Sequence, residues 1–574
     1  MITRILAIFA VACSLAPAQL TVQQKVLDFQ AMAAQFAKHY GPYEWKVRAR
    51  NFDLLDTGPW IDRVRRSKDD LEFIEISLEY VARLDDTHSG YGWGGGFFAR
   101  LPFTTDIYDG KVLIDSLQRN LLPVATFPFQ IGDELVSVDG KTSEEWITDF
   151  RRFIGNANER SNRRTAAGRI VARGQSSYPR AHEIGDNARV VIRRANGGDE
   201  SYEIPWIKSG LPVDTIGPVP SPLPGSLTLQ RLLLGPATQA GEPAHLQTLR
   251  AMTDFSVPRA QSEQWVLGIG SRTPVFSPPP GFVLRQGAAQ ADFLLSGTYA
   301  SGGLRIGFIR IPSFSPASDF FTTLANTPAL RELETEVAFM QANTDGLIVD
   351  VMRNPGGGCY LSAAAQRFIP YQFKTAGEEH RATISARLVM EIARDGARAA
   401  GLDAWVVDFY DRLLREIETA YKENRGLTGP QPLFCTGWNF DLLPAQVVYT
   451  KPMMVLTDEF SISAADIFSA IMQDAGRALL FGWRTNGGGG RAGGPGIIGG
   501  GHYSEAGVGV TRTLVTRKAQ VVTDDHPTAH YIENIGVRPD IYNDYMTREN
   551  LMTGGRPFVE AFTQAMVEHI RRNQ

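Results

Sequence analysis

Apolar residues change their spacing several times along the chain, and each change predicts a different kind of structure. Between Val22 and about Leu84 they recur at helical intervals, which predicts a small helical domain. Short apolar runs separated by turn residues then predict β-structure from Leu101 to about Ile207. Residues 208–301 are rich in proline and glycine and have little periodicity, which is typical of a linker, a lid or an insertion.

From Gly302 onward, strand-like runs alternate with helical stretches. This alternation predicts an α/β sheet covered by helices. We therefore expect a multidomain protein of the α/β (α+β) class. Its expected divisions are a leader at 1–18, a helical domain at 19–100, a β-rich domain at 101–207, the insertion at 208–301 and an α/β core at 302–574.

One junction in the core has the layout of a nucleophile site. The apolar run Met453 to Leu456 has the length of a strand, and apolar residues from Ala464 to Met472 have helical spacing. Ser463 lies between them, where the free amides of a helix start can stabilise an oxyanion on a substrate carbonyl. Serine is also a preferred helix cap, so the junction alone fits catalysis and simple capping equally.

A second segment of the core predicts a tight turn beside a strand. The apolar run that begins at Gly346 breaks abruptly into Asn354, Pro355 and three glycines, Gly356 to Gly358. Glycines permit a sharp turn and let backbone amides approach a ligand closely. An oxyanion hole requires both properties.

Together these segments resemble the S41-type family of tail-specific, C-terminal processing serine peptidases. The shared pieces are RIGFIRIPSF, the D-x-x-R-N-P-G-G element at 350–357, and F-S-I-S-A-A-D followed by QDAGRALLFG. The resemblance implies a crotonase-like α/β peptidase core with Ser463 as nucleophile. It further implies an oxyanion hole made by the amides of Ala464 and of Gly356 or Gly357.

The chain departs from the common family pattern at the general base. Many members pair the serine with a lysine in a G-K-G turn, but Gly488 occupies that position here. A glycine cannot deprotonate a serine, so a histidine is the expected replacement. His88 follows an N-terminal helix in an Asp-x-His context, which resembles the tricorn and chlamydial protease-like activity factor branches. His502, His526 and His530 are weaker alternatives.

A carboxylate is needed to orient such a histidine and to stabilise its cation. Glu533 lies in an E-N-x-G-V-x-P-D element that resembles the C-terminal motif of the same two branches. The resemblance therefore implies a Ser-His-Glu site, although a plain turn carboxylate fits the isolated motif as well. Thr87 is a further hydrogen-bond donor beside His88.

Two other regions carry weaker resemblances. The string IGDELVSVDGKTSEEW is similar to the strand-turn-helix core of PDZ domains, in which a peptide adds to a sheet edge beside a helix. The insertion at 208–301 occupies the place of an inhibitory segment in the chlamydial branch. It is expected to be either an autoinhibitory segment of a zymogen, a lid or a passive tether.

The net charge and the absent metal-binding patterns argue against nucleic-acid partners and bound metals. A net charge of -4 and a pI near 6.2 leave no basic footprint for nucleic acid. The sequence has no His-Glu-x-x-His pattern and no cysteine cluster, so no metal or organic cofactor is expected.

The first residues have the pattern of an export signal. Arg4, the apolar run Ile5 to Leu15 and the small residues at 16–18 predict a cleaved secretory signal and a secreted or periplasmic protein. Cys359 and Cys435 would remain, either paired or free.

The function expected from these observations is that of a secreted serine endopeptidase acting through an acyl-enzyme. Its partners would be protein or peptide substrates, with no stable membrane insertion, and a homodimer is left open. The alternative is a catalytically inactive protein on the same fold that binds peptides or hydrophobic ligands.

Overall fold

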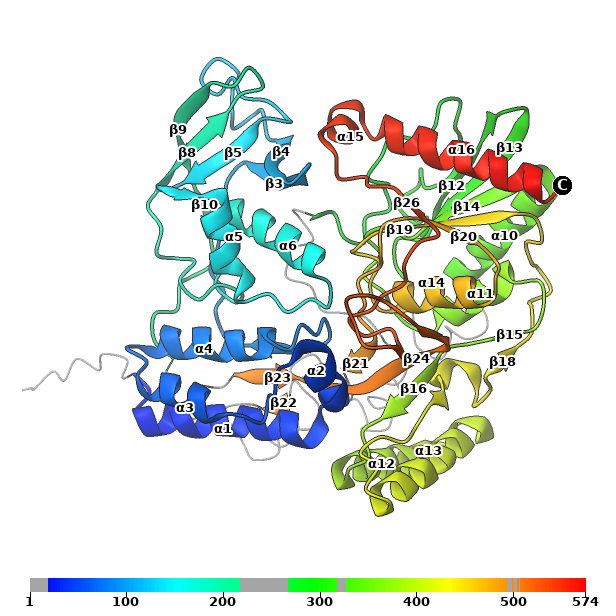
Figure 1. Cartoon of the computed structure of the whole chain (residues 1–574), viewed down its shortest axis with the longest axis horizontal. Helices are drawn as coiled ribbons and strands as arrows, with labels where there is room; N and C mark the ends of the chain where they lie inside the picture. Colours follow the sequence, from blue (N-terminus) through cyan, green and yellow to red (C-terminus); the bar gives the residue numbers. More distant parts are fainter. Residues whose placement is uncertain (1–18, 217–266, 317–326, 493–497, 500–502, 505) are drawn as a thin grey trace, which may run out of the picture.

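The structure is a computed structural model that describes residues 19–216, 267–316, 327–492, 498–499, 503–504 and 506–574 (Figure 1). The predicted secretory signal at 1–18 and most of the predicted insertion lie outside the described residues. Among the described helices, none combines the length and the apolar composition needed to cross a bilayer.

The helical domain is formed by α1 (Val22–His39), α2 (Tyr43–Arg50), α3 (Gly58–Arg65) and α4 (Asp70–Ala82). Its core includes Phe29 and Phe36, which pack edge-on against Tyr80. The loop after α4 carries His88 and leads into β1 (Gly90–Gly92), which pairs with β23 (Gly507–Gly509) from the far end of the chain. This pairing holds the helical domain against the C-terminal part of the molecule (Figure 1).

The β-rich domain contains a sheet in the order β3-β4-β5-β8-β9, with β6 beside β5. Its strands are β3 (Phe103–Tyr108), β4 (Lys111–Leu117), β5 (Glu134–Val138), β6 (Lys141–Thr142), β8 (Asn187–Arg193) and β9 (Asp199–Pro205). A small second sheet joins β10 (Ile207–Ser209), β2 (Phe98–Arg100) and β7 (Ala172–Gly174). Helices α5 (Ser143–Arg151) and α6 (Glu159–Val171) complete the domain.

Strand β3 lies at the edge of the larger sheet, where a PDZ-type domain would add a peptide strand. Helix α6 of the same chain packs against this strand. The hydroxyl of Thr105 donates to the carbonyl of Ala167 over 3.1 Å, and Asp106 is ion-paired with Arg164 at 2.6 Å. Both strand residues are buried. Helix α6 therefore lies beside the sheet edge that the resemblance assigned to a peptide.

The core is a seven-stranded sheet in the order β11-β12-β13-β14-β19-β20-β26. The strands from β13 to β26 run parallel, and β11 and β12 are antiparallel. Their bounds are β11 (Val283–Gln286), β12 (Leu295–Ser301), β13 (Leu304–Arg310), β14 (Gly346–Asp350), β19 (Met453–Thr457), β20 (Leu479–Gly482) and β26 (Ile541–Tyr542). Residues 283–301 therefore belong to the core sheet, not to the insertion predicted at 208–301.

Helices cover both faces of this sheet, as near-continuous apolar strands require. In β14, Leu347 and Val349 face one core cluster whereas Ile348 faces another. The first cluster includes residues of α10 (Pro328–Asn343), α11 (Tyr360–Phe368) and α14 (Ala464–Asp474), and the second includes residues of α16 (Arg556–Arg572). The short helix α15 (Arg548–Thr553) precedes α16.

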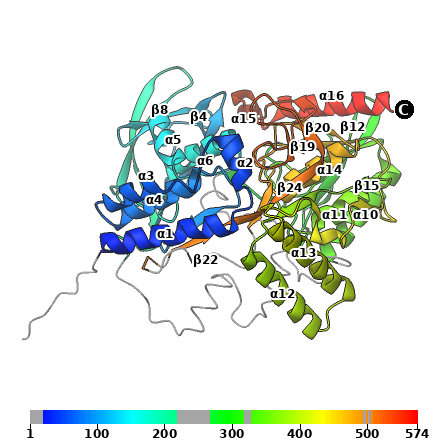
Figure 2. The same cartoon turned by 60° about the horizontal axis from the view of Figure 1, so that its bottom comes forward.

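Smaller elements flank the core. Strands β17 (Gln431–Pro432), β16 (Gly377–His380), β24 (Thr511–Val521) and β21 (Gly490–Ala492) form a second sheet with β25 (Ala529–Tyr531). Strand β15 (Phe373–Lys374) pairs with β18 (Asp441–Leu442), and β22 (Ile498–Gly499) pairs with β23. Helices α12 (Ile384–Ala399) and α13 (Ala404–Lys422) form a hairpin at the periphery, followed by the 3-10 turn η2 (Phe434–Thr436) (Figure 2).

Candidate active site

Ser463 lies on a strained turn between strand β19 and helix α14. Its backbone has φ 59° and ψ -111°, a combination that a non-glycine residue adopts only when its surroundings enforce it. The carboxylate of Asp466, in the first turn of α14, accepts the amide of Ser463 over 2.6 Å. Strand β19 and its neighbour β14 end at the same edge of the parallel sheet, where α/β folds place their sites.

His88 meets Ser463 in the structure. Its Nε2 atom lies 2.9 Å from the Ser463 hydroxyl oxygen, and both side chains are buried. The loop after α4 is held by Asp86, which accepts the backbone amide of His88 over 2.9 Å and the hydroxyl of Thr511 over 3.0 Å. The Asp-x-His context of the sequence thus has a structural role, because the aspartate fixes the backbone of the histidine.

The imidazole occupies the place of the missing lysine. A side chain added at Gly488 would have its Cβ atom 3.3 Å from His88 Cε1. Asp466 positions this glycine turn by accepting the amides of Gly487 over 2.8 Å and Gly488 over 3.1 Å. Burial has the largest effect on the pKa of Asp466 and raises it to about 6, although these hydrogen bonds lower this pKa. One carboxylate therefore aligns Ser463 and the turn beside the histidine.

The glycine turn after β14 lies against Ser463. A Cβ atom at Gly356 would be 2.8 Å from Ser463 Cβ and 3.0 Å from the amide nitrogen of Ala464. The amide of Gly356 itself donates to the side-chain oxygen of Asn354 over 2.8 Å. Within the described residues, the amides of Gly357 and Ala464 have no hydrogen-bond acceptor. Of the three expected oxyanion donors, these two are available and Gly356 shapes the turn.

Glu533 is fully buried near this pair, but its hydrogen bonds go to other groups. In the described part of the chain, its carboxylate accepts the amide of Gly489 over 2.9 Å and the ammonium of Lys46. Burial is the largest influence and raises the pKa of Glu533, and Asp86 raises it as well. Lys46 lowers this pKa, and the net value is about 8. Nothing in the sequence distinguishes Lys46, because a lysine in a short, highly charged helix is normally solvated.

The other candidates lie apart from Ser463 or outside the described residues. His526 faces Asp525 at 3.1 Å, and His530 lies 4.0 Å from Glu379. His502 lies outside the described residues. Thr87 donates to the side-chain oxygen of Asn486 over 2.7 Å, which ties the histidine loop to the glycine turn.

Cys359 and Cys435 form a disulfide that spans 76 residues of sequence. Cys359 immediately follows the glycine turn and is the residue before helix α11. The bond therefore attaches the end of the oxyanion turn to the η2 segment. The sequence had left this pairing open.

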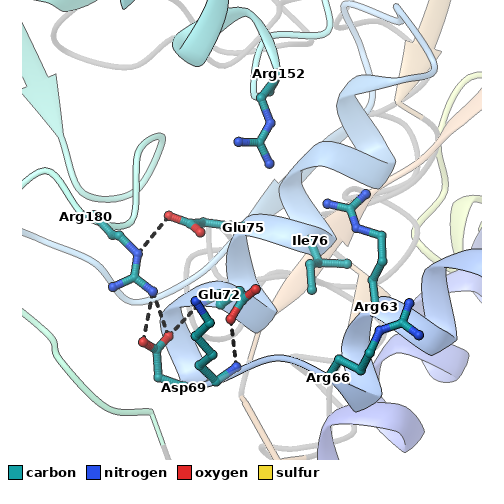
Figure 3. Close-up of a pocket in the computed structure, with 9 residues that line it drawn as sticks. Arg63, Arg66, Asp69, Glu72, Glu75, Ile76, Arg152 and Arg180 are labelled. Carbon is teal, nitrogen blue, oxygen red and sulfur yellow. Dashed lines mark hydrogen bonds and ion pairs between the residues drawn. The ribbon is translucent and has the colours of Figure 1, made fainter. Parts of the chain in front are cut away.

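A separate cavity of about 520 Å³ lies beside helices α3 and α4 (Figure 3). Ion pairs surround it: Arg180 contacts Asp69 at 2.9 Å, and Arg63 and Arg152 each contact Glu79 at 2.8 Å. Arg152 and Arg180 come from the β-rich domain and the carboxylates from α4 and the residue before it. The ion pairs of Arg152 and Arg180 join the two domains, and none of the residues lining the cavity belongs to the Ser463 site.

Comparisons with known proteins agree with this geometry. Residues 305–543 match peptidase family S41, and residues 98–211 match a PDZ domain. The fold is similar to that of mature CPAF, with a TM-score of 0.69 and 20% identity over 96% of this chain and 99% of that one. A protein of Chlamydia muridarum is 24% identical over 518 residues, 82% of each chain. A protein of Chlamydia pneumoniae is 23% identical over 596 residues, 96% of this chain and 91% of its own.

The fold and the serine site define a serine-type peptidase, whose substrates are proteins or peptides. Residues 305–543 of its core match peptidase family S41, within a mixed α/β architecture in which residues 98–211 match a PDZ domain.

Proposed function

We propose that this protein is a secreted endopeptidase with Ser463 as nucleophile, His88 as general base and Glu533 as the carboxylate that supports the histidine. The observation that carries the proposal is the 2.9 Å approach of His88 Nε2 to the Ser463 hydroxyl. This distance lies within the range that proton transfer from a nucleophile to its base requires. The turn at Ser463 supports the same role, because strained backbone clusters at functional sites.

In this mechanism His88 takes the hydroxyl proton while Ser463 Oγ attacks a peptide carbonyl. The amides of Ala464 and Gly357 bind the oxyanion of the tetrahedral intermediate, and a single such donor is worth about 100- to 1000-fold in turnover. The protonated His88 then gives its proton to the leaving amine, which leaves an acyl-enzyme. Water, activated by the same imidazole, hydrolyses the ester and restores the site.

Glu533 acts in this proposal through its charge and its position. Its carboxylate lies close to Lys46 and to the amide of Gly489, the residue after the turn that contacts His88. An ionised carboxylate there stabilises the imidazolium that forms when Ser463 loses its proton.

Labelling by a fluorophosphonate probe tests the assignment directly. We expect wild type to label and Ser463→Ala to show none, while His88→Ala slows labelling by about 100-fold or more, as loss of a general base does. His530→Ala is a matched control, because it removes a histidine outside the site. Labelling of His88→Ala at the wild-type rate would exclude His88 as the base. A folded wild-type protein that does not label would support the alternative, an inactive protein that binds peptides or hydrophobic ligands.

Export and activation are part of the same proposal. The charged and apolar pattern of residues 1–18 supports a cleaved signal, which N-terminal sequencing of secreted protein would test. We also propose that the chain is a zymogen whose insertion occludes the site until it is cut. Incubation of wild type beside Ser463→Ala tests this, because identical band patterns over time would exclude self-processing.

A further inference from the structure

Helix α2 places a buried lysine behind the candidate active site. Lys46 is 0% exposed although its helix is short and highly charged. Its ammonium donates to the carboxylate of Glu533, to the side-chain oxygen of Asn534 over 2.8 Å and to the carbonyl of Asp85 over 2.9 Å. An ammonium with three acceptors is fully satisfied, which a buried charge requires.

These acceptors belong to two segments that are distant in sequence. Asp85 lies in the loop that carries His88, whereas Glu533 and Asn534 belong to the C-terminal element. Asn534 reinforces the link, because its side-chain nitrogen donates to the carbonyl of Asp85 over 2.9 Å. Its backbone has φ 62°, and Trp45 donates to its side-chain oxygen over 3.2 Å. Residues 45 and 46 thus bind the glutamate element to the histidine loop.

The charges around Glu533 are unfavourable without Lys46. Burial has the largest effect on Glu533 and raises its pKa. Asp86, in the histidine loop, faces Glu533 and raises this pKa as well. Tyr40, from the end of α1, faces both carboxylates, and it contributes no positive charge. Lys46 lowers the pKa of both Asp86 and Glu533.

The remaining charged groups on this side pair elsewhere. The carboxylate of Asp85 contacts Arg50, and Arg151 contacts it at 3.1 Å. The imidazole of His88 contacts Ser463. Lys46 is therefore the basic side chain that the structure places in direct contact with Glu533.

We propose that Lys46 is a positioning residue of the peptidase site, which favours the ionised form of Glu533 and fixes it relative to the loop of His88. This inference rests on the proposed roles of Ser463, His88 and Glu533. Lys46 does not touch the reacting atoms; it acts through Glu533. Without it, the carboxylate stays protonated up to a higher pH and stabilises the imidazolium over a narrower pH range.

The pH dependence of labelling separates this role from a structural one. In wild type, labelling of Ser463 should rise as Glu533 loses its proton, with a midpoint near pH 8. Because a positive neighbour lowers the pKa of a carboxyl group, Lys46→Met should move this midpoint up by a unit or more. At pH 7.5 the labelling rate should fall by about tenfold, as a one-unit shift implies. Glu533→Gln should lack this rise altogether.

Two further variants control for folding. Lys25→Met removes another buried lysine of the same domain, paired with Asp70 at 3.3 Å, and should lower the melting temperature without moving the pH midpoint. At alkaline pH, where Lys46→Met leaves an ionised Glu533 without its partner, the double variant Lys46→Met/Glu533→Gln should melt above Lys46→Met alone. It should label no more slowly than Glu533→Gln.

Each outcome supports or overturns one of the two proposals. If Ser463→Ala loses labelling but Lys46→Met keeps the wild-type midpoint, the role of Lys46 is overturned and the peptidase assignment stands. The positioning role is also overturned if Lys46→Met slows labelling of Ser463 by the same factor at every pH, and if the melting-temperature losses of the two single variants add up in the double variant. If Ser463→Ala still labels, the proposed function fails, and the positioning role fails with it.

Discussion

His88 Nε2 lies 2.9 Å from the hydroxyl oxygen of Ser463, although 375 residues separate the two in sequence. The contact depends on the pairing of β1 with β23, which holds the helical domain against the C-terminal part of the chain. It also depends on Gly488, because any side chain there would meet the imidazole. The absent lysine and the present histidine are thus two parts of one arrangement.

We predict that Gly488→Lys inactivates the enzyme by displacing its own base. The new Cβ atom would lie 3.3 Å from His88 Cε1 and 3.5 Å from Ile462 Cγ2. The labelling rate of Ser463 should fall by about 100-fold, a typical contribution of a general base. In the double variant His88→Ala/Gly488→Lys the imidazole space is free for the lysine. Labelling at alkaline pH should then exceed that of His88→Ala by about tenfold. Wild-type labelling by the single variant would contradict this account.

The local pattern around Ser463 was predictable because it is short-range. The strand expected at 453–456 is observed at Met453–Thr457, and the helix expected from Ala464 to Met472 extends to Asp474. Both are encoded by apolar spacing within a dozen residues. The resemblance to S41 peptidases supplied His88, which no local periodicity distinguishes from other loop histidines.

Other features depend on contacts between distant segments and could not be predicted. Lys46 is buried because Glu533 reaches it from the C-terminal part of the chain and Asp85 reaches it from the loop after α4. Strands β11 and β12 lie in a stretch rich in small residues, and they are held in the sheet because β12 pairs with β13 and β11 pairs with β12. The PDZ-like string predicted a sheet edge beside a helix, but the string ends before α6 and does not identify α6 as the helix that packs against β3.

Gly356 is predicted to be irreplaceable for steric reasons. It has φ 92°, and a Cβ atom there would lie 2.7 Å from the carbonyl oxygen of Ile462 and 2.8 Å from Ser463 Cβ. Gly356→Ala should lower both the melting temperature and the labelling rate, the latter by about 100-fold, because the oxyanion turn must shift. Gly303 is a matched control, with φ 79° and no atom within 4 Å of its added Cβ. Gly303→Ala should cost about 1 kcal/mol and leave labelling unchanged. Equal effects of the two substitutions would refute the steric argument.

The disulfide between Cys359 and Cys435 should contribute strongly to stability. It closes a loop with a sequence separation of 76, for which the chain-entropy estimate is about 4 kcal/mol. Cys435→Ser should lower the free energy of unfolding by about this amount, and Cys359→Ser should do the same. A reductant should lower the melting temperature of wild type but not of either variant. A reductant effect of equal size in all three proteins would show that the bond is not the cause.

Arg164 should stabilise the nucleophile loop from the β-rich domain. Its guanidinium lies 2.6 Å from Asp106 in β3 and 2.9 Å from Glu459, which precedes Ser463 by four residues. All three side chains are buried. Arg164→Met leaves both carboxylates short of a partner, so it should lower the free energy of unfolding by about 3 to 5 kcal/mol at pH 7. It should also slow labelling of Ser463.

The pH dependence of this loss tests its electrostatic origin. Burial by itself would raise the pKa of Glu459. Arg164 and Arg160 lower this pKa by more than burial raises it, so its value is about 2. A carboxyl group whose pKa falls on folding stabilises the protein above its unfolded value, here 4.5, and loses that contribution as pH falls through 2. The stability difference between wild type and Arg164→Met should therefore be largest above about pH 5 and shrink below about pH 4. Arg193→Met, which removes an exposed partner of Asp199 in the same domain, is the control and should show no measurable loss at either pH. A difference that stays constant down to pH 3 would mean that Arg164 acts through packing and not through its charge.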